Sequence, residues 1–93
     1  DGLEVNLDAH TVVVDGERVA LTYKEFELLK VFMEHPGEVF TRQWLYERIW
    51  NGTYSEKNRT VDIHVQTLRK KLGPCGSLIE SVKYIGYRMK KVP

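Results

Sequence analysis

The sequence has little of what disulfide-bonded, secreted or membrane proteins require. Cys75 is its only cysteine, so no internal disulfide can form and the fold does not depend on an oxidising compartment. A lone cysteine of this kind is expected to be a structural or loop residue. No apolar run approaches the roughly 20 residues of a membrane-spanning helix, and the first residues show no basic segment followed by an apolar stretch. These absences favour a cytoplasmic protein without a membrane partner.

Patterns typical of metal sites and catalytic sites are missing as well. His10, His35 and His64 stand far apart and show no metal-ligand spacing, so we expect no zinc site and no cofactor. The chain has no Ser/His/Asp or Cys/His constellation, no phosphate-cradling glycine-rich loop and no paired acids in an apolar setting. We therefore expect no enzyme activity.

The charged residues are divided unevenly along the chain. With 93 residues, 42% of them hydrophobic and 29% charged, the sequence predicts one globular domain over residues 1–93. The net charge is only +1, but residues 1–58 carry six Lys or Arg against eleven Asp or Glu, which gives −5. Residues 59–93 carry eight against two, which gives +6. The basic half is where a polyanion would dock, although a basic tail that only aids solubility would show the same asymmetry.

Hydrophobic patterning predicts an α+β domain in the order strands, three helices, hairpin. Residues 3–21 favour an antiparallel sheet, because apolar and polar residues alternate from Leu3 and because Asp15-Gly16 between β-rich runs is typical of a type I′ turn. The later elements are helices at about residues 22–35, 41–50 and 58–72, followed by a hairpin at 78–90.

Capping residues predict where the helices begin. Thr22 has Glu25 three residues later, which is the spacing of a capping box. Thr41 is the expected cap of the second helix, and Asn58 or Ser55 that of the third.

The third predicted helix has two different faces. At 100° per residue, one side carries an apolar stripe expected to face the core, consisting of Val61, Val65, Leu68 and Leu72. The opposite side carries Arg59, Ile63, Gln66 and Lys70, with Thr60 and Thr67 on one flank. His64 lies between the two faces, where a histidine is more often a packing or hydrogen-bonding residue than a ligand.

Ile63 is the most informative residue of the polar face. An isoleucine on the side of the helix opposite the core does not stabilise the fold. Its neighbours on this face are cations, an amide and hydroxyls, and in such company it can contact a thymine methyl in the major groove. Arg59 can pair with guanine and Gln66 with adenine, while Arg69 and Lys70 can neutralise phosphates. The alternative is a surface helix with an incidental isoleucine, because single exposed apolar residues are common.

The C-terminal hairpin adds a second basic surface. It presents Lys83, Tyr84, Arg88, Lys90 and Lys91. Beside a DNA-contacting helix such a hairpin is a wing, whose tip can reach an adjacent minor groove. The alternative is a sheet edge kept soluble by lysine. The sequence thus predicts a winged helix-turn-helix that binds double-stranded DNA with the helix beginning near Arg59.

Four spaced motifs cover nearly the whole chain. They are Leu21-Thr22-x-x-Glu25-Phe26-x-Leu28-Leu29, Pro36-Gly37-x-Val39-x-Thr41-Arg42-x-x-Leu45, Arg59-Thr60-Val61-Asp62-Ile63-His64-Val65 with Leu68-Arg69-x-Lys71-Leu72, and Gly86-Tyr87-Arg88. With these motifs the chain resembles the C-terminal effector domain of the OmpR/PhoB family of bacterial two-component response regulators. The resemblance implies a transcription regulator in a phosphorelay, whose dimers bind tandem DNA half-sites. Its phosphorylated receiver domain is absent from these residues.

The resemblance also implies which residues meet the partners. Those implied to contact DNA are Arg59, Thr60, Ile63, His64, Gln66, Thr67, Arg69 and Lys70 from the helix, with Ser81 and Lys83 from the wing. The loop 50–58 is implied to meet RNA polymerase, and its first members are Trp50, Asn51, Gly52, Thr53 and Tyr54. From the sequence alone, Trp50 and Tyr54 could equally pack against the helices.

The chain departs from the family pattern in two places. Where the family usually has Arg-Gly-x-Gly-Tyr, this chain has Lys83-Tyr84-Ile85-Gly86-Tyr87, so a flexible glycine and a planar cation are both replaced. We expect the geometry of the wing and its minor-groove contact to differ accordingly. Gln66 and Thr67 stand where relatives often have basic residues, which indicates a different target sequence.

Two other binding modes compete with DNA binding. A winged-helix protein-interaction module would carry acids or large aromatics on the exposed face of the third helix, and residues 63–72 show neither. RNA binding is disfavoured because the A-form major groove excludes a helix and because no aromatic platform on a sheet is evident.

Overall fold

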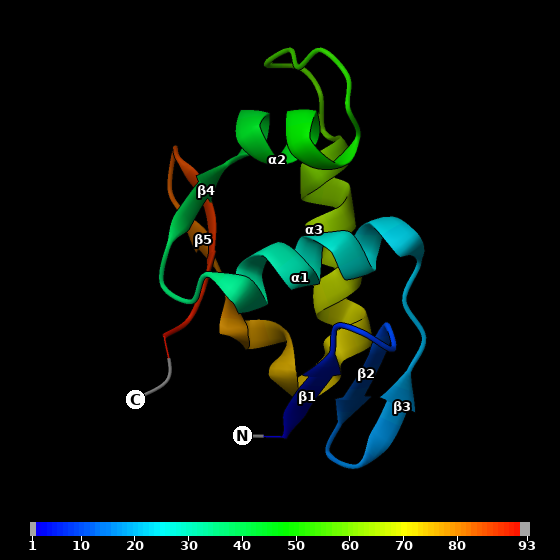
Figure 1. Ribbon diagram of the computed structural model, residues 1–93. Helices are drawn as coiled ribbons and strands as arrows, with labels where there is room; N and C mark the ends of the chain where they lie inside the picture. Colours follow the sequence, from blue (N-terminus) through cyan, green and yellow to red (C-terminus); the bar gives the residue numbers. More distant parts are fainter. Residues whose placement is uncertain (1, 92–93) are drawn as a thin grey trace.

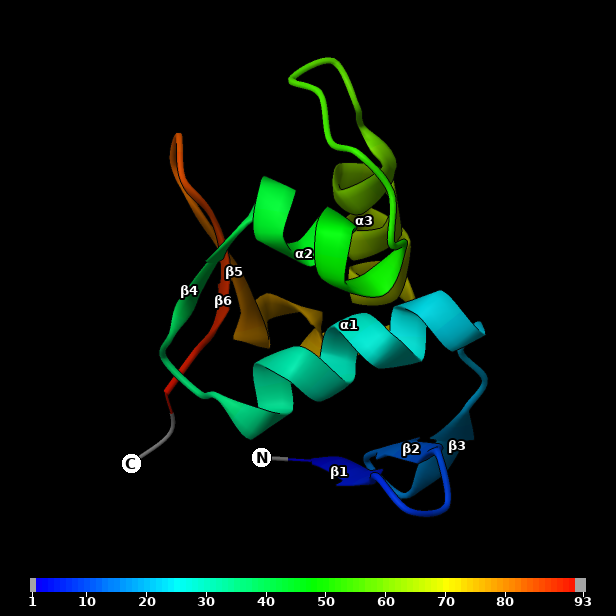
Figure 2. The same cartoon turned by 45° about the horizontal axis from the view of Figure 1, so that its top comes forward.

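The computed structural model describes residues 2–91 (Figure 1). Its elements follow in the order β1 (Leu3–Asn6), β2 (Thr11–Val14), β3 (Glu17–Val19), α1 (Tyr23–Glu34), β4 (Val39–Thr41), α2 (Arg42–Ile49), α3 (Thr60–Leu72), the 3-10 helix η1 (Gly73–Leu78), β5 (Ile79–Val82) and β6 (Gly86–Met89). Two three-stranded antiparallel sheets, β1-β2-β3 and β4-β6-β5, flank the helices. In Figure 2, α1 lies between the N-terminal sheet and the pair α2 and α3. The predicted α+β winged-helix architecture is confirmed.

The N-terminal sheet is organised around its second hairpin. Asp15 and Gly16 have φ values of 49° and 85°, as a type I′ turn requires. Val12 and Val14 are buried while their neighbours are not, which is the period-two pattern of a strand with one face on the core. The sheet ends at Val19, two residues before the predicted boundary.

The first two helices begin at their predicted caps. The hydroxyl of Thr22 accepts the backbone N–H of Glu25 at 3.2 Å, and the carboxylate of Glu25 accepts the N–H of Thr22 at 2.9 Å, which completes a capping box. The hydroxyl of Thr41 accepts the N–H of Trp44 at 3.0 Å at the start of α2. The cap positions fix where α1 and α2 leave the sheets.

The start of α3 differs from the prediction. The N-cap is Arg59, with φ −102° and ψ 9° and no side-chain cap, and the helix begins at Thr60 rather than at 58. Asn58 still satisfies one helix N–H, because its Oδ1 accepts from the backbone of Thr60 at 2.9 Å. At the other end the helix stops at Gly73, whose φ of 55° suits glycine.

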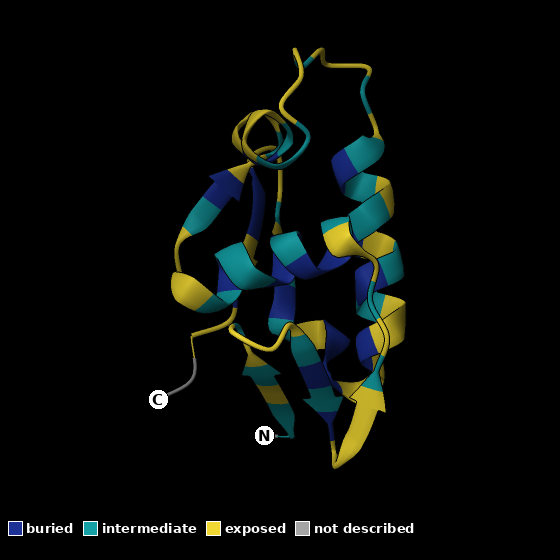
Figure 3. Ribbon diagram, turned by 45° about the vertical axis from the view of Figure 1, so that its right-hand side comes forward, coloured by how far each residue is buried: buried dark blue, intermediate teal, exposed yellow. Residues whose placement is uncertain are grey.

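The core lies between the three helices and the inner faces of both sheets. The predicted stripe of α3 belongs to it, since Val61, Val65, Leu68 and Leu72 are all buried. Figure 3 shows this buried side of α3 turned toward the rest of the domain and an exposed edge turned outward. The orientation on which the interface prediction depends is therefore confirmed.

Two elements were not predicted. The first is β4, which pairs antiparallel with β6 and makes the wing part of a three-stranded sheet. η1 follows α3 directly and buries Cys75, in agreement with a structural role for that thiol. Among residues 2–91, none of the helices has the length and apolar character needed to cross a bilayer.

Candidate nucleic-acid interface

The outward face of α3 carries a row of four exposed side chains of different chemistry. Ile63 is 56% exposed although its helix neighbours Val61 and Val65 are buried. The other members of the row are Arg59, Gln66 and Lys70, and all are exposed. The row thus combines two cations, an amide and one apolar group, which suits hydrogen bonding and methyl contact with base edges.

Arg59 stands at the N-terminal end of this row. One of its guanidinium nitrogens, Nη1, lies 3.9 Å from Oδ2 of Asp62, and its side chain is 67% exposed. An exposed pair at that separation is weak. The cation therefore stays accessible to a second anion.

His64 and Thr60 lie on the flank of the row and are half-buried. Nδ1 of His64 donates to the carbonyl oxygen of Thr60 at 2.9 Å. The His64 ring meets the Trp50 ring edge-on, with 4.8 Å between the centroids. These contacts fix the imidazole against the loop between α2 and α3, which is the packing role expected for a histidine at a helix margin.

Glu25 couples α1 to α3 through a contact that the sequence did not predict. Its buried carboxylate accepts the hydroxyl of Thr67 at 2.9 Å and the ammonium of Lys71 at 2.7 Å. Burial raises the pKa of Glu25, but the hydrogen bonds from Lys71, the Thr22 backbone and Thr67 outweigh it, so the pKa lies below its ordinary value. The donors of Thr67 and Lys71 are thus engaged inside the domain.

Arg69 joins α3 to the wing. Its Nε and Nη2 donate to the carbonyl oxygen of Ile79 at 2.9 and 2.7 Å, and Nη2 donates to Oγ of Ser81 at 3.0 Å. The guanidinium carbon lies 5.5 Å from the centre of the Tyr87 ring. The resemblance implied that Arg69 and Ser81 contact DNA; in the structure they bond to each other and tie β5 to α3.

Asp62 connects α2, α3 and β6 at the point where α3 begins. Its Oδ1 accepts Nε of Arg42 at 2.6 Å and also accepts the hydroxyl of Tyr87. The guanidinium of Arg42 lies 5.0 Å from the centre of the Tyr87 ring. The three partners come from three of the motifs singled out in the sequence, so these motifs meet in space.

The ionisation of this cluster follows from its contacts. Burial raises the pKa of Asp62, but hydrogen bonds from Tyr87 and Arg42 outweigh it, so the pKa lies below its ordinary value. Burial and the hydrogen bond to Asp62 raise the pKa of Tyr87. The hydrogen bond to Asp62 also raises the pKa of Arg42. The cluster therefore holds a carboxylate, a guanidinium and a neutral phenol at neutral pH.

The wing is held close to β4 and keeps several cations exposed. A Cβ at Gly86 would collide with the carbonyl oxygen of Phe40, so glycine lets the two strands approach. Arg88 is paired across the hairpin with Glu80 at 2.9 Å. Lys83 in the turn of the wing, and Lys90 and Lys91 after β6, are exposed as well.

The loop between α2 and α3 is anchored by aromatic packing. The Trp50 ring stacks on that of Tyr46 with 5.8 Å between centroids, and the Tyr54 ring lies 6.1 Å from the same tyrosine. Both Trp50 and Tyr54 are half-buried, as the packing alternative predicted. The loop residues left exposed before Tyr54 are Asn51, Gly52 and Thr53.

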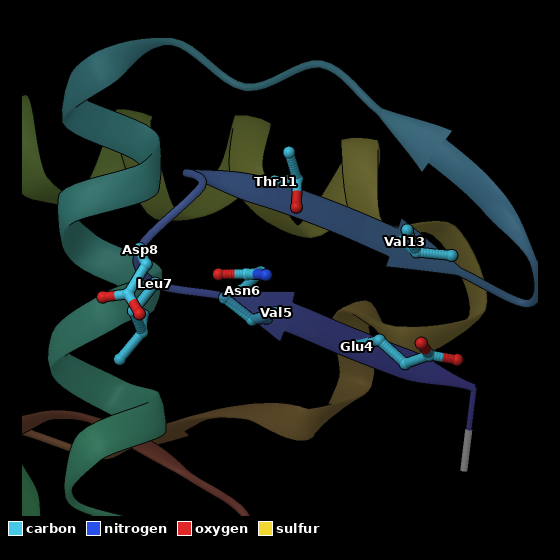
Figure 4. Close-up of a pocket in the computed structure, with 7 residues that line it drawn as sticks. All are labelled: Glu4, Val5, Asn6, Leu7, Asp8, Thr11 and Val13. Carbon is cyan, nitrogen blue, oxygen red and sulfur yellow. The ribbon is translucent and has the colours of Figure 1, made fainter.

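One hollow lies on the N-terminal sheet, away from the exposed row of α3. It measures about 650 Å³ and is lined by Glu4, Val5, Asn6, Leu7, Asp8, Thr11 and Val13 (Figure 4). Its two carboxylates would repel a phosphate backbone. Within the described range 2–91, no three side chains of the ligating types gather closely enough to hold a metal ion.

Comparison with known families gives one match over most of the chain. The model of the family described as "Transcriptional regulatory protein, C terminal" matches residues 16–89. Among curated proteins, the transcriptional regulatory protein SrrA of Staphylococcus aureus is 39% identical over 92 residues. That match covers 95% of this chain but 38% of SrrA, so the chain spans well under half the length of this relative.

Solved structures of the same fold include one bound to DNA. The RstA DNA-binding domain of Klebsiella pneumoniae in complex with the RstA box superposes with a TM-score of 0.87 at 29% identity, covering 97% of this chain and 92% of that one. The response regulator DrrB, an OmpR/PhoB homologue of Thermotoga maritima, gives a TM-score of 0.86 at 30% identity, covering 97% of this chain and 42% of DrrB.

Proposed function

The chain belongs to the family of C-terminal domains of transcriptional regulatory proteins, of the OmpR/PhoB response-regulator type, and from this membership we propose that it binds duplex DNA sequence-specifically as a regulator's output domain. The observation that carries the proposal is the exposed row on α3, in which Ile63 stands in water opposite a fully buried stripe. Covering Ile63 with a ligand would remove its apolar surface from water, which is favourable. We propose no catalytic role.

The size of α3 fits the proposed ligand. Thirteen residues make a helix about 20 Å long. The major groove of B-DNA, roughly 12 Å wide, admits such a helix and displays a donor and acceptor pattern that distinguishes all four base pairs. α3 thus acts as the recognition helix, with its outward row on the base edges.

The direct contacts in this proposal come from side chains that the domain does not use itself. Arg59 pairs with guanine or a phosphate, Gln66 with adenine, and Ile63 with a thymine methyl. Lys70 and Lys83 neutralise phosphates, the latter from the wing.

The remaining predicted contact residues have a supporting role. They are Thr60, His64, Thr67, Arg69 and Ser81. His64 donates to the carbonyl of Thr60, Thr67 donates to Glu25, and Arg69 donates to Ile79 and to the hydroxyl of Ser81. Through these contacts they hold the recognition helix and the wing in position, and they approach DNA only at their edges. A binding surface keeps its geometry when supporting hydrogen bonds and packing of this kind hold its side chains in place.

The partners beyond DNA follow from the family. We propose that the exposed edge of the loop, at Asn51, Gly52 and Thr53, meets RNA polymerase, with Trp50 and Tyr54 as its anchors. SrrA is long enough to hold a second domain of the receiver type, and we propose that this chain works beside one, on tandem half-sites. A regulator of this kind acts on the chromosome, so we propose the cytoplasm as its compartment.

The first test is selection of bound sequences from a random duplex pool. We expect enrichment of one short motif. Duplex RNA added as a competitor should not displace the selected DNA duplex from the domain. Passage through heparin at low salt without retention, together with no enrichment, would contradict DNA binding and favour the protein-interaction alternative.

The second test separates the proposed face from charge alone. Arg59→Ala and Lys70→Ala should each reduce the log–log salt slope of binding to the selected duplex by about one. Arg18→Ala removes an equal charge from the exposed part of β3 and serves as the matched control. Equal slopes for all three variants would refute the assignment of the α3 face.

A further inference from the structure

The wing ends in an exposed apolar tip that the proposed contacts do not use. Tyr84 is 89% exposed and Ile85 is 52% exposed, and both lie in the turn between β5 and β6. In Figures 1 and 2 this turn projects from the body of the domain, far from the N-terminal sheet. Two large apolar side chains are thus held out where the domain's own core gives them no cover.

The backbone at the tip is unfavourable for the residue that occupies it. Tyr84 has φ 68°, in the left-handed region where glycine, asparagine and aspartate are preferred. The turn is closed by the N–H of Ile85, which donates to the carbonyl oxygen of Val82 at 2.9 Å. A glycine would adopt this conformation without strain. The tyrosine therefore destabilises the turn, and its side chain recovers little of that cost by burial.

One cation lies beside the tip. Nζ of Lys83 lies 5.2 Å from the centre of the Tyr84 ring, and both residues are exposed. Lys90 and Lys91 are also exposed, but they follow β6 at the opposite end of the hairpin, where the N–H of Lys90 donates to the carbonyl oxygen of Leu78 at 2.7 Å. An apolar tip beside the Lys83 cation fits a ligand that is anionic at its edges and apolar inside. The minor groove of duplex DNA is such a ligand, with phosphates at its rims and deoxyribose rings along its walls.

Minor-groove-binding proteins commonly use exposed apolar side chains as wedges between base pairs. We propose that Tyr84 and Ile85 insert as such a wedge into the minor groove next to the major groove occupied by α3. The wedge partly unstacks one base step and bends the duplex, while Lys83 contacts the flanking phosphates. This inference rests on the proposed DNA binding.

Such a wedge adds specificity at a position where no base edge is read. Pyrimidine–purine steps such as TA and CA unstack and kink most easily, so the energy of insertion depends on the step. The selected sequences should therefore show a flexible step in the flank covered by the wing, at a fixed distance from the motif read by α3.

The experiment uses the selected duplex in two forms. In one, 2-aminopurine replaces single adenines along the flank, and its fluorescence rises where a base loses its stacking. In the other, fluorophores at the two ends report bending by energy transfer. The test variant is Tyr84→Asn, which tolerates the left-handed backbone but removes the ring. Tyr84→Phe keeps the ring, and Tyr23→Ser removes a 66% exposed tyrosine from α1 as the matched control.

We expect bound wild-type protein to brighten one 2-aminopurine position and to shorten the end-to-end distance. Tyr84→Asn should abolish both signals and weaken Kd by about tenfold, as expected for loss of one stacked aromatic, with an unchanged salt slope. Tyr84→Phe and Tyr23→Ser should behave as wild type. Urea denaturation should show Tyr84→Asn to be at least as stable as wild type, because the turn is no longer strained.

Other outcomes overturn the wedge and leave DNA binding standing. If the wild type binds tightly without brightening any flank position, Tyr84 does not unstack a base step. If Tyr84→Asn changes only cooperative binding to two adjacent half-sites, the tip contacts a second protein molecule. Complete absence of duplex binding by the wild type would instead refute the proposed function itself.

Discussion

Two sets of polar residues along α3 have similar compositions, but one set is exposed and the other is hydrogen-bonded within the domain. The exposed row contains Arg59, Gln66 and Lys70, whereas the engaged set contains Thr67, Arg69 and Lys71. The engaged residues donate hydrogen bonds to Glu25, Ile79 and Ser81, and thereby fix α3 to α1 and to the wing. Adjacent residues such as Arg69 and Lys70 thus differ in whether another part of the domain lies within reach of the side chain.

The comparison predicts that residues which fix α3 affect stability, while residues of the exposed row affect only binding. The largest effect is expected for Asp62→Ala. The substitution leaves the guanidinium of Arg42 and the hydroxyl of Tyr87 without their shared acceptor, and breaking a partly buried ion pair of this kind costs about 3 kcal/mol. Urea denaturation measures the loss, and Arg59→Ala should change the free energy of unfolding by less than about 0.5 kcal/mol.

Glu25→Gln should lower the free energy of unfolding by roughly 2 kcal/mol, because the ammonium of Lys71 loses its buried anion. The folded pKa of Glu25 lies below its ordinary value of 4.5. Its contribution to stability is therefore complete above that value and is lost as pH falls through the folded pKa. Denaturation measured between pH 7 and pH 3 should show a shallower acid destabilisation in the variant. A parallel pH profile would contradict the assigned ion pair.

Arg69→Ala and Lys70→Ala compare the two roles at neighbouring positions. Arg69→Ala should cost about 1.5 kcal/mol of stability, because the carbonyl of Ile79 and the hydroxyl of Ser81 lose a charged donor. Lys70→Ala should leave stability within about 0.5 kcal/mol of wild type and act on the salt dependence of binding. Thermal melts and binding titrations on both variants test this prediction. A stability loss in Lys70→Ala and a change only in binding in Arg69→Ala would show that the two roles are exchanged.

Ile63→Ala gives the smallest and most specific effect. We expect a loss of about 1 kcal/mol in discrimination for the preferred duplex over one with uracil in place of thymine at the contacted step. The melting temperature should hardly change, because Ile63 is already exposed in the free domain. A large drop in melting temperature would show that the side chain supports the fold instead.

The sequence predicted the features that depend on local spacing. The capping box at Thr22, the Asp15-Gly16 turn and the buried stripe of α3 each depend on residues within a few positions of one another. The start of α3 was wrong by two residues, since Asn58 caps from outside the helix rather than beginning it.

The long-range contacts were beyond that kind of prediction. Asp62 finds Arg42 20 residues away and Tyr87 25 residues away, and Glu25 finds Lys71 46 residues away. Only the packing of α1, α2 and β6 around α3 brings such groups together. For the same reason the helical pattern alone could not show that Arg69 bridges α3 and β5, because a surface arginine and a bridging one look alike in such a pattern.

The hydrogen bonds from Arg69 to β5 tie α3 to the wing hairpin and fix the spacing between them. If both elements contact DNA as proposed, the domain fits best a duplex whose successive grooves are separated by that spacing. Overwinding or underwinding the DNA between the two contact points changes that distance and the angle with it. The domain should therefore sense the helical twist of its target, even at base pairs that it does not touch.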